Sequence, residues 1–180
     1  FIKQWLVRSM QITLRQPAVL GIVFVLPMFL NFGGVSQSGN YLVEDYTKNM
    51  FASFEKNALV ISYQWDYWVS ASLYYQEVEG YRRDVIVLDK ELFRRSWYIE
   101  QLRVNYPEVY RRSKNEIIAF SRELEKFEHD VPYDPAAIES AYNSMVNSII
   151  EQNYHDRPVY VTIEMEEQFA ASFERVPVGL

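Results

Sequence analysis

The stretch that most constrains the fold is residues 57–89, where two short apolar runs flank a helical segment. The runs, residues 58–62 and 84–89, are rich in β-branched residues and show no polar alternation, which is typical of strands buried on both faces of a parallel sheet. Residues 69–79 between them contain no glycine or proline, and Gly80 follows where a helix would end. The pattern predicts a βαβ unit with a right-handed crossover.

The rest of the C-terminal part predicts more helices and a third strand. Residues 41–55 form an expected amphipathic helix before the first strand, and residues 91–106 and 108–128 are expected helices separated by Pro107. The pair Asp134-Pro135 predicts the start of another helix, because both residues are favoured at those positions. Residues 159–163 are expected to form the third buried strand.

These elements predict an α/β fold, a small Rossmann-like three-layer domain with a short parallel sheet. The expected strand order, 2-1-3, puts the first strand at the centre. Ligands of such sheets bind at the carboxyl ends of the strands, where neighbouring connections diverge. The residues at those ends are 62–66, Asp89 and 164–166.

The N-terminal part is dominated by an apolar run, because residues 17–32 carry no charge. A bilayer core needs about 20 mainly apolar residues, and residues 17–35 are therefore expected to form a transmembrane helix in which Pro27 is tolerated. A buried helix of a soluble protein is the alternative.

Charges on the two sides of this run differ in sign. Residues 1–16 carry Lys3, Arg8 and Arg15, as in a basic amphipathic juxtamembrane segment or the end of a preceding membrane helix and its loop. Acidic residues follow at 44–45. The positive-inside rule places the N-terminus in the cytoplasm, and residues 36–40 are then a tether to an extracytoplasmic domain over residues 41–180.

Composition excludes several classes of function. A net charge of −6 argues against nucleic acid as a partner. The absence of cysteine excludes disulfides and thiolate metal sites, and two histidines disfavour zinc. Aromatic residues make up 16% of the chain, which suits a membrane interface, a carbohydrate-binding surface or a bulky core. Because the chain opens on Phe1, we expect it to be cut from a longer protein.

Several motifs occur in the order found in a known family, at residues 57–62, 64–66, 74–85, 92–98 and 157–160. Over residues 17–180 the chain resembles bacterial polytopic membrane proteins that are similar to eukaryotic protein O-mannosyltransferases of the GT-C type. The resemblance implies the last transmembrane helix and C-terminal domain of a membrane glycosyltransferase of the inner membrane, with the domain on the periplasmic side. One departure is the loop after the first strand, Tyr-Gln-Trp-Asp-Tyr-Trp at residues 63–68, where many members have Gly-Asp-Asn-Asp.

The same resemblance implies that the acidic catalytic residues and the lipid-linked sugar donor belong to an upstream transmembrane bundle. No catalytic residue, metal or cofactor is therefore assigned to this chain. Its expected partners are the membrane, that bundle, and an acceptor protein or glycan. The domain is expected to dock the acceptor or brace the bundle; the alternative is a non-enzymatic membrane-anchored interaction module of an envelope complex.

The candidate ligand-binding residues lie at the strand ends. Gln64, Trp65 and Asp66 are expected to line a surface cleft with Asp89 at its edge, where the two aspartates could approach each other to bind a metal or polarise a hydroxyl. In the alternative, Trp65 is buried against the next helix and both aspartates cap helices.

Aromatic and basic residues supply the other candidates. Residues 63, 65, 67 and 68 could form a stacking platform for a sugar ring, or pack against the membrane or its bundle. Arg94 and Arg95 could hold a lipid phosphate, or one of them could form a structural ion pair. Arg82 and Arg83 could likewise hold a phosphate, or one of them could form a structural ion pair.

Overall fold

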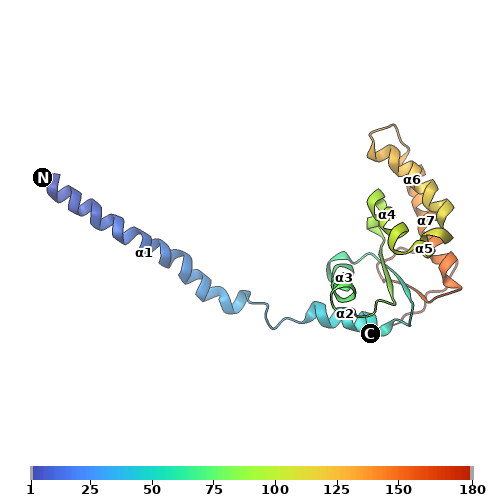
Figure 1. Cartoon of the computed structure of the whole chain (residues 1–180), viewed down its shortest axis with the longest axis horizontal. Coiled ribbons are helices and arrows are strands. Elements are labelled where there is room, and N and C mark those ends of the chain that lie inside the picture. Colours follow the sequence, from blue (N-terminus) through green and yellow to red (C-terminus); the bar gives the residue numbers. More distant parts are fainter. Residues whose placement is uncertain (1, 179–180) are drawn as a thin grey trace. The chain divides into compact units, whose positions relative to one another are not determined.

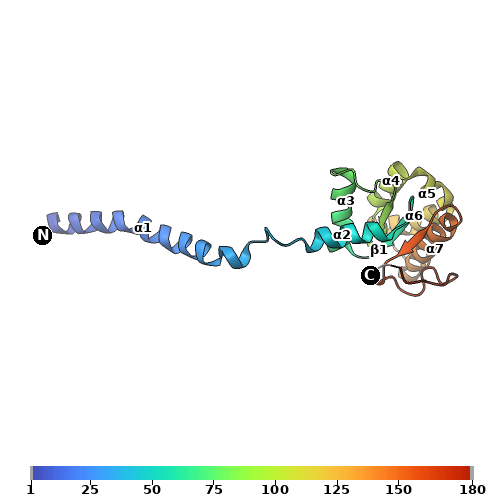
Figure 2. The same cartoon turned by 90° about the horizontal axis from the view of Figure 1, so that it is seen from below.

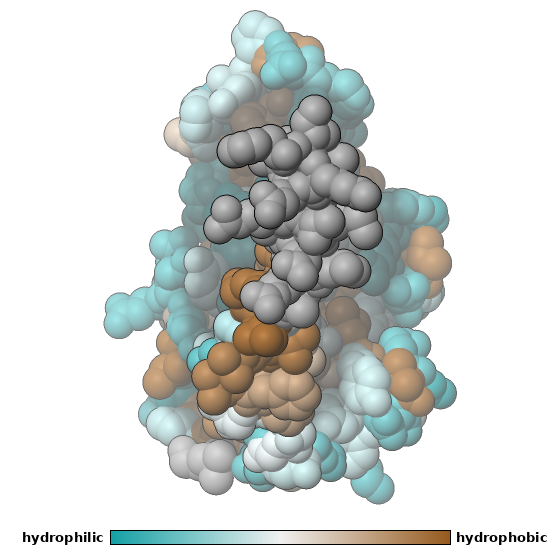
Figure 3. Space-filling view, turned by 90° about the vertical axis from the view of Figure 1, so that its left-hand side faces the viewer, coloured by the Kyte–Doolittle hydropathy of each residue, from teal (hydrophilic) through white to brown (hydrophobic). Residues whose placement is uncertain are grey.

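The computed structural model describes residues 2–178, with side chains described for residues 19–178. The chain divides into two compact units, residues 1–41 and 42–180. The first contains a single helix, α1 (Ile2–Val35), which passes through Pro27 without interruption (Figure 1). Its described side chains are mainly apolar and exposed, and they form the brown surface beside the grey atoms in Figure 3.

A transmembrane helix was expected over residues 17–35. Among the residues whose side chains are described, no helix is both long and apolar enough to cross a membrane. The described part of this stretch begins only at Val19. The basic segment expected at residues 1–16 lies outside the described side chains.

The second unit is built on a three-stranded parallel sheet of order β2-β1-β3, as predicted. Its strands are β1 (Leu59–Ser62), β2 (Ile86–Asp89) and β3 (Val159–Val161). Leu59 of β1 pairs with Ile86 on one side and Val159 on the other, and Ser62 pairs with Asp89. The whole of β1 is buried, which explains its lack of polar alternation.

Helices cover both faces of the sheet (Figures 1 and 2). Helices α2 (Leu42–Ser53) and α3 (Ser70–Glu77) lie over the face where Val60 and Val87 pack. Leu59, Ile61 and Leu88 point to the other face. There they pack against a larger core contributed by α4 (Ser96–Asn105), α5 (Pro107–Arg112), α6 (Lys114–Glu128) and α7 (Pro135–Tyr154).

Two predicted helices are divided in the structure. Residues 91–106 begin with a 3₁₀ turn, η2 (Glu91–Arg94), and the extended backbone of Arg95 separates it from α4. Residues 107–128 form α5 and α6, which meet at the non-helical Ser113. The start predicted at Asp134 is confirmed, because its carboxylate accepts a hydrogen bond from the Ala136 amide at 2.9 Å.

Three apolar side chains at helical spacing within residues 69–79 do not face the core. Leu73, Tyr74 and Val78 are exposed, whereas Ser72 and Gln76 are buried. The Gln76 amide explains this orientation, because it donates to the backbone carbonyls of Arg82 (2.8 Å) and Val85 (2.6 Å) and so satisfies the turn before β2. The helical spacing of these apolar residues therefore indicates the helix but not its buried face.

Candidate functional site

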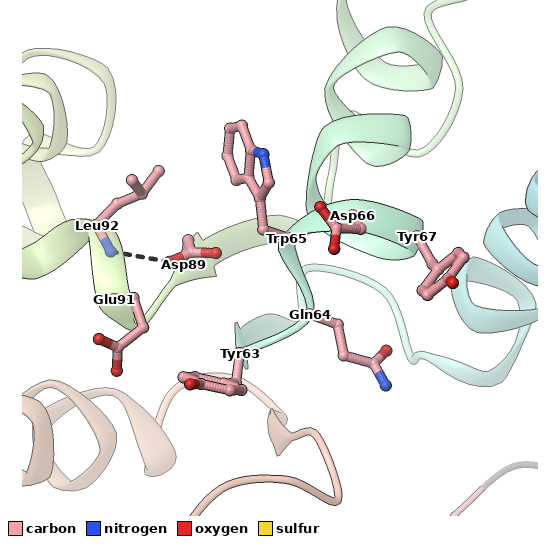
Figure 4. A pocket seen from close by; sticks show the side chains of 8 residues that line it. All are labelled: Tyr63, Gln64, Trp65, Asp66, Tyr67, Asp89, Glu91 and Leu92. Atoms are coloured by element: carbon pink, nitrogen blue, oxygen red, sulfur yellow. Dashed lines mark hydrogen bonds between the residues drawn. The ribbon is translucent and has the colours of Figure 1, made fainter.

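A surface cleft of about 520 Å³ lies at the carboxyl ends of β1 and β2 (Figure 4). Eight residues line it: Tyr63, Gln64, Trp65, Asp66, Tyr67, Asp89, Glu91 and Leu92. Residues 64–66 and Asp89, which were expected to share one cleft, all line it, and their role in binding a ligand stays a prediction. The site lies at the strand ends because β1 and β2 are parallel neighbours and finish side by side, Ser62 opposite Asp89.

A π-helical turn, η1 (Trp65–Val69), shapes the wall that follows β1. It buries Trp68 completely against Phe51, with ring centroids 4.8 Å apart, while Trp65 and Tyr67 stay exposed. Trp68 therefore anchors the loop and is not part of an aromatic platform. Single π-helical turns are frequent at functional sites.

Trp65 and Asp66 do not take the structural roles proposed as alternatives. Trp65 is 44% exposed, so it is not buried against α3. The Asp66 carboxylate makes no hydrogen bond or ion pair to any described residue, and η1 has no side-chain cap. In the view of Figure 4 the Trp65 side chain rises between Asp66 and Asp89. The described residues contain no cluster of metal-binding side chains.

Gln64 points away from Trp65 and Asp89 (Figure 4). Its Oε1 accepts a hydrogen bond from the Tyr46 hydroxyl at 2.7 Å, and its Nε2 donates to Glu164. Both ends of the side chain are therefore engaged by the protein. These two bonds hold Gln64 in the wall of the cleft, and its amide keeps a second N–H and a second lone pair.

Asp89 lines the cleft and also caps the turn that follows β2. Its Oδ1 accepts a hydrogen bond from the Leu92 amide at 2.8 Å (Figure 4), as the helix-cap alternative proposed. Only 2% of Asp89 is exposed, and this burial raises the pKa of its carboxyl group. The Asp89 amide donates to the Tyr98 hydroxyl at 2.9 Å, and burial raises the pKa of that phenol.

Lys90, which sequence reasoning missed, is buried directly behind the cleft. Its ammonium donates to both carboxylate oxygens of Glu166, at 2.7 and 2.8 Å, and lies 3.2 Å from Glu91. The rings of Tyr63 and Phe169 flank it, with centroids 4.8 and 5.1 Å from Nζ. Lys90 thus joins two cleft residues to the segment that follows β3.

Arg94, the other expected ligand residue, does not line the cleft and forms an ion pair instead. It donates to the Glu139 carboxylate with both terminal nitrogens, at 2.9 and 3.1 Å, and lies over the Tyr142 ring at 3.9 Å. Hydrogen bonding from Arg94 lowers the pKa of Glu139. The structural alternative, an ion pair between η2 and α7, therefore holds.

Arg82 and Arg83 close the ends of two helices. The Arg82 guanidinium donates to the carbonyls of Phe51 in the last turn of α2, and of Phe54 (3.2 Å) and Glu55 (2.9 Å) just after it. Arg83 donates to the carbonyls of Gln76 (2.7 Å) and Glu77 (3.1 Å) at the end of α3. Cations are favoured at helix C-termini, where carbonyls lack intrahelical donors. Both arginines are therefore structural.

The electrostatics of the cleft are acidic. Three of its eight residues are carboxylates, Asp66, Asp89 and Glu91, and none is a lysine or arginine. The nearest cations described above, Lys90 and Arg94, are each held by glutamates. Of the three carboxylates, only Asp66 makes no bond to another described side chain or amide.

Comparison with known proteins connects this region to a membrane protein family. Residues 43–111 match the family model described as TMEM260-associated domain 2. TMEM260 is a membrane protein family related to O-mannosyltransferases. The match runs from α2 into α5 and includes all eight cleft residues, but it covers less than half of the chain. No curated protein and no solved structure matched.

Proposed function

We propose that residues 42–180 are the acceptor-docking domain of a membrane glycosyltransferase related to the O-mannosyltransferases. The observation that carries the proposal is that the TMEM260-associated match contains the complete cleft. The fully buried Trp68 behind the cleft wall supports it, because the protein presents Trp65 and Tyr67 on a fixed turn. Binding residues are often carried on loops held by a rigid scaffold.

The proposal assigns docking to this domain and chemistry to a separate membrane bundle. General acid–base catalysis needs a titratable group within hydrogen-bond reach of the reacting atom. Asp89 is committed to the Leu92 amide, and Glu91 is shared between Lys90 and Arg94. The sugar donor and the catalytic acid would then belong to the bundle, as the family resemblance implies.

The proposal also places the domain outside the cytoplasm, at the inner membrane. Its support is the charge asymmetry of the sequence: Lys3, Arg8 and Arg15 precede the apolar run, and Glu44 and Asp45 follow it.

Transfer assays on the full-length protein test the docking role. With a lipid-linked sugar and an acceptor protein, we expect Trp65→Ala to raise the KM for the acceptor about tenfold, equivalent to a loss of about 1.4 kcal/mol of binding, with kcat little changed. Trp97→Ala is the matched control, because Trp97 is 56% exposed and lies outside the cleft. No transfer to any acceptor would remove the enzymatic half of the proposal, and an unchanged KM would remove the docking half.

A second candidate is an interaction module without enzymology, favoured by the exposed apolar side chains of Leu73, Tyr74 and Val78. Monomeric proteins rarely leave large contiguous apolar patches exposed unless these bind something. A Leu73→Glu variant separates the two functions. It should weaken association with partner proteins of an envelope complex if this face is the interface, whereas Trp65→Ala should not.

A further inference from the structure

We infer that the cleft binds a neutral saccharide ring and rejects the phosphate group of a lipid-linked or nucleotide-linked sugar. The inference rests on the proposed function only for the source of the saccharide, which would be a glycan on the acceptor and not the donor. The chemistry of the cleft carries the rest.

The apolar half of the cleft is suited to the C–H face of a pyranose. The exposed Trp65 indole and the Leu92 side chain project on the same side of the strand ends (Figure 4). Tyr63 and Tyr67 are 48% and 58% exposed at the other margins. Aromatic rings offer a large apolar area with few torsions to fix on binding.

The polar half of the cleft offers acceptors for hydroxyl groups. Asp66 makes no bond to another described side chain, so both of its oxygens can accept hydrogen bonds from a ligand. The Glu91 side chain is 44% exposed and is shared with Lys90 and Arg94. Bonds from hydroxyls to ionised carboxylates are stronger than those between neutral groups. Vicinal hydroxyls beside an apolar ring face meet both halves of the cleft.

Phosphate is excluded by charge. Parallel α/β sheets commonly bind phosphates at these strand ends, using backbone amides of a glycine-rich turn, but the turn after β1 here contains no glycine. The cleft has three carboxylates and no cation. Lys90, the cation at the end of β2, is only 2% exposed and its ammonium is bound by Glu166. An anion would therefore meet repulsion from the carboxylates without a compensating cation.

A cationic ligand fits less well than a neutral one. The Tyr63 ring already has the Lys90 ammonium over it, at 4.8 Å. Asp89 is buried and capped, and Glu91 is already near two cations. A cation would thus gain mainly from Asp66. The cleft volume, about 520 Å³, lies within the range of roughly 300–1,000 Å³ of small-molecule sites.

The test is a titration of the whole 180-residue chain, labelled with ¹⁵N, in which the indole N–H resonances of its four tryptophans are followed. The probes are methyl α-mannopyranoside, methyl α-glucopyranoside, methyl β-galactopyranoside, inorganic phosphate and arginine. We expect at least one glycoside to shift the Trp65 resonance saturably in the millimolar range, with Trp97 unmoved. Trp65→Ala should abolish this binding and Asp66→Asn should weaken it at least threefold, whereas Trp97→Ala should bind normally.

Three outcomes would overturn the inference: no glycoside shifts Trp65, phosphate saturates the site, or arginine binds more tightly than every glycoside. Amide resonances of the variants report whether they remain folded. The outcome is separable from that of the transfer assay. Glycoside binding without transfer keeps the inference and removes the proposed function, and transfer without glycoside binding does the reverse.

Discussion

At the residue scale, the Arg82 side chain connects backbone segments on both sides of the first strand through hydrogen bonds. It donates to three carbonyls at the C-terminal end of α2 and to the Asp84 carboxylate, which in turn accepts a hydrogen bond from the Asn57 amide at 3.1 Å. It does so with a φ of 50°, in the left-handed region.

We predict that Arg82→Ala lowers the free energy of unfolding by about 2–3 kcal/mol, because several partly buried carbonyls lose their donor. Chemical denaturation measures the change. Arg95→Ala is the matched control and should change stability by less than about 0.5 kcal/mol, since Arg95 is exposed and its side chain contacts no described partner. An equal loss in both variants would show that the Arg82 contacts contribute nothing specific.

Asp89 yields a prediction about pH. Burial raises the pKa of its carboxyl group in the folded protein. As the pH rises, the unfolded chain releases this proton first, so the contribution of Asp89 to stability is present at low pH and is lost as the pH rises through the folded pKa.

Asp89→Asn keeps an oxygen for the Leu92 amide but carries no charge. We therefore expect its stability, relative to the unsubstituted protein, to increase as the pH rises above the ordinary carboxyl range. Asp89→Ala should instead lose the cap, at a cost of about 1 kcal/mol. Denaturation curves from pH 4 to pH 8 test both expectations. If the difference in the free energy of unfolding between the unsubstituted protein and Asp89→Asn did not change with pH, the expectation for Asp89→Asn would be wrong.

The position of the cleft could be predicted from sequence, because strand ends determine which residues meet. The state of its polar groups could not. Lys90 and Glu166 are 76 residues apart in the chain, and Arg94 and Glu139 are 45 apart. Only tertiary packing brings each pair together, so local sequence could not show that both cations are already neutralised. The Glu164 partner of Gln64 is likewise distant in sequence, so local sequence could not show that this bond forms.

At the element scale, strands were easier to predict than helix faces. Buried strands have a simple signature, an unbroken apolar run, which β1 and most of β2 match. The third strand, expected to be buried over residues 159–163, is shorter and only partly buried. The break at Ser113 has no glycine or proline to mark it. Apolar periodicity does not identify the inward face of α3, because the buried Gln76 there satisfies backbone carbonyls.

The ion pair between Lys90, at the end of β2, and Glu166, after β3, gives a third prediction. Lys90 is buried, so removing its partner leaves a poorly compensated ammonium, whereas replacing the lysine removes the charge. We expect Glu166→Gln to lower the free energy of unfolding by about 1–3 kcal/mol. This is less than for a fully buried pair, because Glu166 is half-exposed. Lys90→Met should lower it by less than about 1 kcal/mol.

Measurement at low pH provides an internal control for the Lys90–Glu166 pair. Hydrogen bonding from Lys90 lowers the pKa of Glu166, so the stability that it contributes is present above the ordinary carboxyl pKa and is lost as the pH falls through the lowered value. The difference in the free energy of unfolding between the unsubstituted protein and Glu166→Gln should therefore become smaller at acid pH. A greater loss for Lys90→Met than for Glu166→Gln would contradict the assigned roles.

At the scale of the whole molecule, the proposed location is testable by topology. We expect a reporter that is active only outside the cytoplasm to work when fused after Leu180 and to fail when fused before Pro17, because basic residues precede the apolar run. The reverse pattern would place residues 42–180 in the cytoplasm. A fusion that is active at neither position would leave no support for an extracytoplasmic domain.

The division into two compact units leads to a last prediction. Residues 42–180 contain both hydrophobic clusters, the sheet and the cleft, and the boundary falls between Tyr41 and Leu42. Stability that comes from buried apolar contacts should therefore reside in this unit. We expect a chain without residues 1–41 to unfold cooperatively, with a free energy within about 1 kcal/mol of the full chain, since substitutions and deletions away from packed contacts have small effects. The Trp65 and Trp68 indole resonances should be unchanged in the shortened chain, because both side chains make their contacts within residues 42–180. A loss of cooperative unfolding would mean that the first 41 residues complete the core, and it would remove the basis for treating the cleft as a site of an independent domain.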